Sequence, residues 1–126
     1  MGANETALAV ATYMRGREAG LLGGGMKLLA AGEGYAKVSL AITADMLNGL
    51  GTAHGGIIFT LADAAFAYAC NSRNEAAVAQ QASITFLTPG RAGVYTVTVN
   101  GQDGRAVAVF QGLSRSIGKK VIPEGV

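Results

Sequence analysis

The sequence has little of what metal, disulfide or membrane chemistry needs. Its 126 residues include one cysteine, Cys70, and one histidine, His54, which excludes an internal disulfide framework and a cysteine-based zinc site. No apolar run reaches the roughly 20 residues of a membrane-spanning helix. The N-terminus lacks the basic region and apolar run of a secretory signal. We therefore expect a cytoplasmic protein with no metal and no membrane partner.

Charged residues are also scarce. They make up 14% of the chain, the net charge is +2, and the ten basic residues form no run. This argues against an extended nucleic-acid surface but leaves room for one phosphate clamp. Half of the residues are apolar, which excludes a disordered tail. The length predicts a single domain over residues 1–126.

Large aromatic side chains are few as well. There is no tryptophan, and Phe and Tyr together number eight, whereas glycine numbers 19 and alanine 23. Small residues leave little side-chain volume for a self-sufficient core. Two explanations stay open: part of the apolar surface is buried between subunits, or a GC-rich genome favours Ala and Gly codons.

The hydrophobic pattern predicts an α+β fold. Residues 4–15 are typical of a short amphipathic helix with Asn4 as a candidate N-cap. Strict alternation over 35–43 predicts a half-buried strand with Val38 on its inner face. Residues 57–70 contain no Gly or Pro and are apolar on all sides, which predicts a helix buried all round.

The second half of the chain is expected to be an antiparallel meander. It comprises strands at 77–87, 94–99 and 106–117, with a turn at 100–104 and a bend at Gly112. A sheet wrapped around one buried helix is the simplest arrangement of such elements. Residues 20–34 are too rich in glycine for a firm prediction, although they contain a candidate strand.

Asp63 is the most informative residue. A carboxylate in an apolar helix costs several kcal/mol to bury unless it is hydrogen-bonded or neutralised. From the residues alone two interpretations are open: Asp63 performs chemistry, or it faces a solvent-filled seam and accepts structural hydrogen bonds.

His54-Gly55-Gly56 immediately precedes this helix. The first N–H groups of a helix lack intrahelical partners, and glycine lets a substrate oxygen approach them, so this is a candidate oxyanion site. An ordinary glycine-rich loop fits the same residues. His54 is a candidate general base or a residue that fixes the loop. Cys70 is more typical of an inert packing residue than of a nucleophile.

The run MLNGLGTAHGG over 46–56, followed by Leu-Ala-Asp at 61–63, resembles the hotdog-fold acyl-CoA thioesterases, and among them the phenylacetate-degradation branch. Further matches lie at 66–72, 83–90 and 109–112, so the resemblance covers about residues 8–118. The combined spacing N-x5-H-G-G-x6-D is far more specific than any of its parts.

The resemblance implies a hotdog fold, an antiparallel sheet around one long helix, and hydrolysis of acyl-CoA to free acid and CoA. Phenylacetyl-CoA and hydroxylated aromatic acyl-CoAs are the implied substrates. Asp63 would be the nucleophile or the general base for water, and the Gly55 N–H would polarise the thioester carbonyl. Asn48 and His54 would position the carbonyl or the water. No cofactor is implied, and family members are dimers that often pair into tetramers.

In one place the sequence departs from the family pattern. A further long strand and turn normally lie between the counterparts of Gly93 and Val94, which are adjacent here. The sheet is therefore expected to be short by one strand, or the sequence lacks residues. The missing stretch commonly contacts CoA. Candidate cations for the CoA phosphates are Arg91, Arg115 and, less specifically, Arg105, Lys119 and Lys120.

Helix geometry predicts a site shared by two subunits. If the helix begins near Gly55, Asp63 lies about 12 Å further along its axis, too far for both groups to act on one carbonyl. A second, antiparallel copy of the helix would bring them together, with Ala62, Ala65 and Ala69 allowing close approach. Other functions considered are a non-catalytic acyl-CoA binding module, a structural oligomerisation domain, and a hydratase, which would need a histidine after His54.

Overall fold

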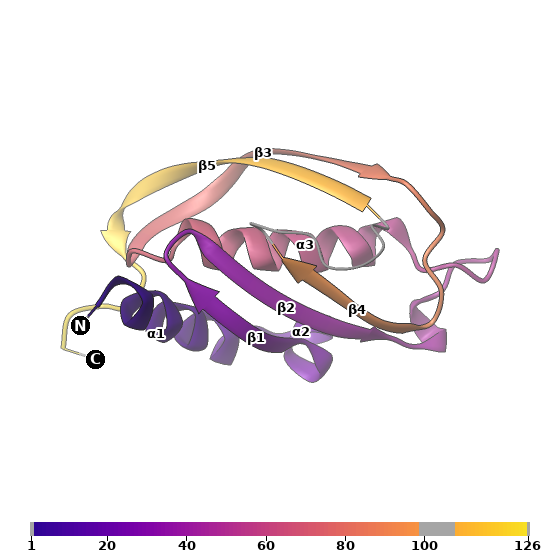
Figure 1. Ribbon diagram of the computed structural model, residues 1–126, viewed down its shortest axis with the longest axis horizontal. Helices are drawn as coiled ribbons and strands as arrows, with labels where there is room; N and C mark the ends of the chain where they lie inside the picture. The colour runs from indigo at the N-terminus through magenta and orange to yellow at the C-terminus, as the bar shows by residue number, and fades with distance from the viewer. Residues whose placement is uncertain (1, 99–107, 126) are drawn as a thin grey trace.

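The computed structural model describes residues 2–98 and 108–125, and its centre is one long helix, α3 (Gly55–Cys70), enclosed by antiparallel strands (Figure 1). The other helical elements are α1 (Ala3–Gly16), α2 (Gly20–Gly25) and the short 3₁₀ helix η1 (Ala44–Met46). The strands are β1 (Lys27–Gly32), β2 (Tyr35–Ile42), β3 (Glu75–Phe86), β4 (Gly93–Thr98) and β5 (Ala108–Lys120). The turn expected at 100–104 lies outside the described residues.

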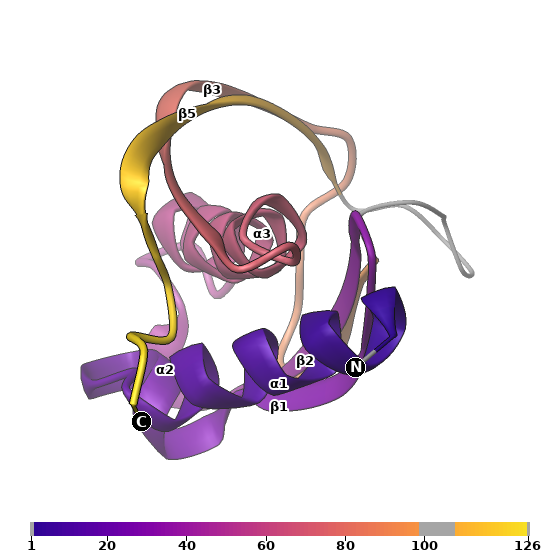
Figure 2. The same cartoon turned by 90° about the vertical axis from the view of Figure 1, so that its left-hand side faces the viewer.

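The expectation of strands wrapped around one helix is confirmed. β3 and β5 arch over one side of α3, while β1, β2 and β4 lie on its other side (Figures 1 and 2). Helix α1 packs against β1 and α3. The inner face of β2 alternates as the sequence predicts, because Ala36, Val38, Leu40 and Ile42 are all buried. These side chains and the buried face of α3 belong to one hydrophobic core.

The predicted meander is wrong. β4 does not pair with β3 or β5; it pairs with β2, from Ile42 opposite Gly93 to Lys37 opposite Thr98. β3 pairs instead with β5. Residues 87–92 carry the chain across α3 from β3 to the sheet that contains β2 (Figure 1). There β4 pairs with the edge of β2, whose backbone N–H and C=O groups would otherwise lack partners.

Among the described residues the strands therefore form two sheets, in the orders β1-β2-β4 and β3-β5. The expected departure from the family pattern, between Gly93 and Val94, falls at the start of β4.

Two further details differ from the expectations. Asn4 is not an N-cap, because α1 begins at Ala3; the Asn4 side-chain oxygen instead accepts a hydrogen bond from the Glu33 N–H (3.0 Å). The glycine-rich stretch contains α2, which local propensity does not favour. The Arg15 guanidinium stabilises its C-terminal end by donating to the Met26 carbonyl (2.7 and 2.9 Å).

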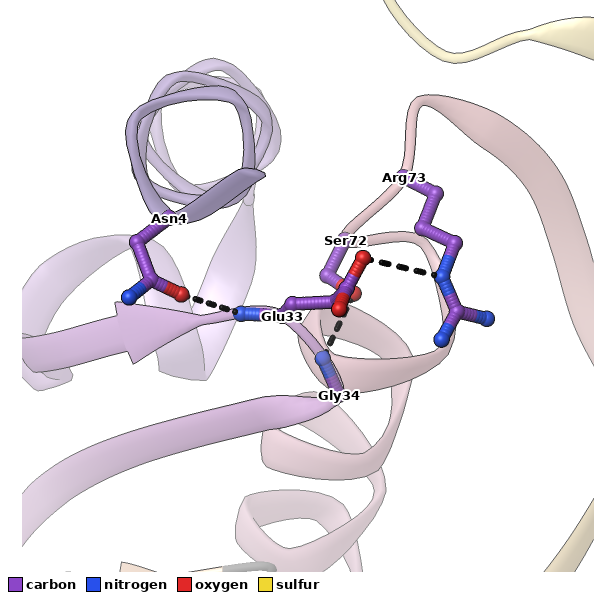
Figure 3. Close-up of polar contacts among 5 residues, drawn as sticks. All are labelled: Asn4, Glu33, Gly34, Ser72 and Arg73. Carbon is purple, nitrogen blue, oxygen red and sulfur yellow. Dashed lines mark hydrogen bonds and ion pairs between the residues drawn. The ribbon is translucent and has the colours of Figure 1, made fainter. Parts of the chain in front are cut away.

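Polar contacts connect the turn between β1 and β2 to helix α1 and to the segment that follows α3 (Figure 3). The Gly34 N–H donates to the Ser72 hydroxyl (2.8 Å), and Arg73 pairs with the Glu33 carboxylate (3.3 Å). Ser72 and Arg73 lie two and three residues after Cys70, the last residue of α3, so these contacts fix the C-terminal end of the helix.

Gly112 shows why a small residue is needed in β5. A Cβ at this position would lie 2.7 Å from Cζ of Phe66 on α3, closer than non-bonded carbon atoms approach. The Phe66 and Phe110 rings are 5.6 Å apart. Gly112 therefore lets β5 lie against the aromatic side chains of α3. The register shifts of the β3–β5 pair lie elsewhere, between Glu75 and Ala77 and between Ala79 and Gln81.

Candidate active site

The N-terminus of α3 has the geometry of an oxyanion site. The helix begins at Gly55, with His54 as N-cap residue. The His54 carbonyl accepts from the N–H groups of Ile57 (3.0 Å) and Ile58 (3.3 Å), whereas the N–H groups of Gly55 and Gly56 form no backbone hydrogen bond within the part of the chain described. These N–H groups lie at the positive end of a 16-residue helix, where developing negative charge on an oxygen is stabilised.

Asn48 fixes the loop that leads into this helix. Its Oδ1 accepts hydrogen bonds from the N–H groups of Leu50 (2.9 Å) and Thr52 (3.2 Å), and its Nδ2 donates to Thr52 Oγ1 (2.9 Å). The Ala53 N–H donates to the Gly90 carbonyl (3.0 Å). The loop is thus closed on itself and attached to the segment after β3, which fixes the direction in which α3 starts.

The structure places Asn48, His54 and Gly55 at one end of α3. The His54 side chain is exposed, and its N–H donates to the Met46 carbonyl (3.1 Å). Phe86, at the end of β3, also lies here, because a Cβ on Gly55 would be 2.9 Å from its Cζ. No sequence spacing links residues 55 and 86, so this neighbour of the oxyanion site was not predicted.

Asp63 lies further along the same helix and is half-buried. Burial raises the pKa of its carboxyl above the usual value, and the negative charge of Glu18 raises it further. A carboxylate in this state is a stronger base than one in water. Glu18 was not among the predicted site residues.

The prediction that this helix is buried all round is wrong for one face. A stripe of partly exposed residues follows helical spacing and includes Asp63; the others are Gly56, Thr60, Ala67 and Cys70. The opposite face is buried. Ala62, Ala65 and Ala69, the residues expected to permit helix approach, all belong to the buried face. A second helix would therefore meet the Asp63 stripe, where Gly56 and Ala67 are small.

The two candidate CoA-binding cations lie apart in one chain. Arg91 follows Gly90, whose carbonyl is bonded to the loop before α3. Arg115 is on β5 opposite Val78, eight residues of β3 before Phe86, or about 26 Å of extended strand. One protomer therefore does not bring Arg91 and Arg115 together.

Within residues 2–98 and 108–125, no three His, Cys, Asp or Glu side chains converge in a way that could hold a metal ion. None of the described helices is long and apolar enough to cross a membrane.

Comparisons with known proteins identify the family of this chain. Residues 50–111 match the family model described as the thioesterase superfamily. The chain is 41% identical to the acyl-coenzyme A thioesterase PaaI of Escherichia coli, a match that covers 79% of this chain and 84% of PaaI. The match extends over 117 residues.

Solved structures with a similar fold include a member of the same family. The structure of E. coli PaaI, from a phenylacetic acid degradation operon, covers 94% of this chain and 99% of its own, with a TM-score of 0.86 and 38% identity. A Streptococcus mutans protein bound to acetyl-CoA has a TM-score of 0.66 and 27% identity, and the match covers 75% of this chain and 90% of that one.

Proposed function

This chain belongs to the hotdog-fold thioesterases, in the branch typified by the acyl-CoA thioesterase PaaI, and from this premise we propose that Asp63 carries its hydrolysis of acyl-CoA to free acid and CoA. The observation that carries the proposal is the half-buried Asp63, with its raised pKa, in an otherwise apolar helix. A non-catalytic binding module would gain nothing from such a carboxylate.

In the proposed reaction the thioester carbonyl oxygen accepts a hydrogen bond from the Gly55 N–H. The Asp63 carboxylate takes a proton from water while the water oxygen bonds to the carbonyl carbon. The C–S bond then breaks, and the CoA thiolate leaves and is protonated. Alternatively, the Asp63 carboxylate attacks the carbonyl itself, and water hydrolyses the resulting anhydride. Asn48 and His54 hold the loop at the oxyanion end. The proposed reaction uses the Gly55 N–H, the Asp63 carboxylate and water, and CoA enters as part of the substrate.

We propose that each site is formed by two subunits. Gly55 and Asp63 are separated by eight residues of one helix, about 12 Å along the axis, whereas both must lie about 3 Å from the reacting atoms. Antiparallel pairing of two α3 helices along the Asp63 stripe would place Gly55 of one subunit beside the partner subunit's Asp63. A two-fold axis generates two equivalent sites. The assembly is a homodimer or a dimer of dimers.

The same pairing supports a role for both arginines in binding CoA. It would bring the C-terminal half of the partner's α3, and with it the partner subunit's Arg115, toward Arg91 of the first subunit. Both guanidinium groups would then lie along one nucleotide path, where they would contact the CoA phosphates. For the acyl group we propose phenylacetyl-CoA or hydroxylated aromatic acyl-CoAs, supported by the likeness to PaaI.

The test is release of free thiol from a panel of aromatic and aliphatic acyl-CoAs by wild type and Asp63→Asn. The wild type should hydrolyse aromatic acyl-CoAs, and Asp63→Asn should lose at least about 100-fold in kcat, the scale of a lost base or nucleophile. Equal rates for the two proteins would refute the role of Asp63. Single turnover in ¹⁸O-water probes the mechanism, because ¹⁸O on Asp63 arises only when an anhydride has formed and water attacks its Asp63 carbonyl.

A further inference from the structure

The four phenylalanines of the chain all lie between α3 and the sheet formed by β3 and β5. Phe59 and Phe66 belong to α3, and the centres of their rings lie 5.3 and 5.6 Å from that of Phe110 on β5. Phe110 is opposite Ile84 of β3, so Phe86, two residues later on β3, is on the same face of the sheet. We call these four side chains the phenylalanine layer.

The phenylalanine layer is separate from the hydrophobic core and is only partly covered. As far as the described residues show, the core contains none of the four rings. Phe59, Phe66 and Phe110 are each partly exposed, and the Phe86 ring is 49% exposed. One exposed apolar side chain is common on a protein surface. Four rings gathered in a partly open layer are typical of a contact site for a further apolar or aromatic group.

Phe86 brings this layer to the oxyanion site. Its ring atoms Cζ, Cε2 and Cε1 lie 2.9, 3.3 and 3.5 Å from the position of a Cβ on Gly55. A carbonyl oxygen that accepts from the Gly55 N–H lies about 3 Å from that nitrogen, so the first atoms of the acyl group and the Phe86 ring both contact one glycine. A phenyl ring one or two bonds from the carbonyl carbon can therefore reach the separation of about 4.5–7 Å at which aromatic rings attract each other.

The same layer flanks Asp63. Phe59 precedes Asp63 by four residues and Phe66 follows it by three, and side chains at these spacings are neighbours on the surface of a helix. In the proposed two-subunit site, the thioester carbonyl lies between Gly55 of one subunit and the partner subunit's Asp63. In that arrangement, aromatic rings border the reacting carbonyl from both subunits.

Building on the proposed roles of Gly55 and Asp63, we propose that Phe86 is a specificity-determining residue of this thioesterase: its ring packs against the ring of an aromatic acyl group whose carbonyl accepts from the Gly55 N–H. The contact is the same in the bound substrate and in the transition state, so Phe86 lowers KM and leaves kcat nearly unchanged. An aliphatic acyl group has no aromatic ring and gains only the apolar contact.

The experiment compares hydrolysis of phenylacetyl-CoA with that of cyclohexylacetyl-CoA, which has a similar size but no aromatic ring. Wild type should prefer phenylacetyl-CoA in kcat/KM by roughly 3- to 10-fold, the effect of one aromatic ring pair. Phe86→Leu keeps an apolar side chain but removes the ring. Its KM for phenylacetyl-CoA should rise by roughly 3- to 10-fold, its kcat should change by less than about two-fold, and the preference should disappear.

Leu113→Ala is the matched control. Leu113 is 56% exposed, as open to solvent as the Phe86 ring. It follows Gly112, whose Cβ position faces Phe66 on α3, so Leu113 lies on the outer face of the sheet. Loss of this apolar side chain should leave the preference for phenylacetyl-CoA unchanged.

A wild type without the preference overturns the proposal, and this comparison needs no substitution. An equal loss of kcat/KM for both substrates in Phe86→Leu also overturns it, because the ring would then only support the start of α3. A loss of preference in Leu113→Ala as large as in Phe86→Leu does the same. If Phe86→Leu does not fold, Phe86→Ile supplies the same comparison. A wild type that hydrolyses no acyl-CoA refutes the proposed function instead.

Discussion

The ring of Phe86 rests against the backbone of Gly55 at the start of α3, so that a Cβ on residue 55 would lie only 2.9 Å from Phe86 Cζ. The ring is 49% exposed and can move. A side chain at position 55 therefore has to displace it or shift the start of the helix.

Gly55→Ala should consequently lower kcat by more than it lowers stability. We expect a loss of roughly 10- to 100-fold in kcat, the range for a disturbed oxyanion donor, and less than about 1 kcal/mol in the free energy of unfolding, because a half-exposed ring has room to be displaced. Steady-state kinetics and urea denaturation measure the two effects. Adding Phe86→Leu removes the clash and should restore part of kcat. If the double variant is as slow as Gly55→Ala, the Phe86 ring is not the cause.

Asp63→Asn should stabilise the protein at neutral pH. The pKa of Asp63 is raised from its ordinary value of 3.8, chiefly by burial, so the folded protein holds this proton more tightly than the unfolded chain. The ionised carboxylate is therefore destabilising above the raised pKa, and its cost disappears as the pH falls through that pKa toward 3.8. Urea denaturation at several pH values should show a gain for Asp63→Asn that grows with pH. A gain that is independent of pH would contradict this account.

Gly112→Ala should destabilise the fold through Phe66. All three nearest contacts of the added Cβ, at 2.7 to 3.0 Å, are with the Phe66 ring. Overpacking of this kind typically costs about 1–3 kcal/mol. Thermal and urea unfolding measure the loss, and Phe66→Leu in the same chain should recover part of it. Additive losses in the double variant would show that the clash lies elsewhere.

Free CoA should inhibit the enzyme, and more weakly as salt rises, because exposed phosphate contacts are screened. Arg91→Ala should raise the inhibition constant and reduce its dependence on salt. Arg17→Ala is a matched control, since the Arg17 guanidinium lies over the Tyr13 ring of α1 (5.5 Å) and should leave inhibition unchanged. Inhibition by CoA that is indifferent to salt would count against a basic docking site.

Much of the fold could be predicted because the signals are local. Alternation in β2 and the continuous apolar run of α3 each specify an element by periodicity. The partners of β4 could not be predicted, because pairing depends on which strand edge is open after the chain has crossed α3. Helix α2 was missed for a related reason, since a tertiary contact from Arg15 stabilises a sequence with poor helix propensity.

The site residues also differ in whether sequence spacing could predict them. Asn48, His54 and Gly55 are close in sequence, so their spacing predicts that they lie together. Phe86 comes from a distant segment, and only the packed structure reveals that its ring lies against Gly55. The partly exposed face of α3 was also missed, because the apolar composition of the helix does not show which of its faces other elements cover.

The central claim is that Gly55 of one subunit and Asp63 of the other act on one thioester, and subunit mixing tests it most directly. Asp63→Asn and Gly55→Val chains, each inactive alone, are mixed after exchange has been confirmed by native mass spectrometry. Each heterodimer then has one site with both groups intact, so equal mixing should restore about a quarter of wild-type activity. Confirmed exchange without recovered activity, or an enzyme that is active as a monomer, would contradict the account.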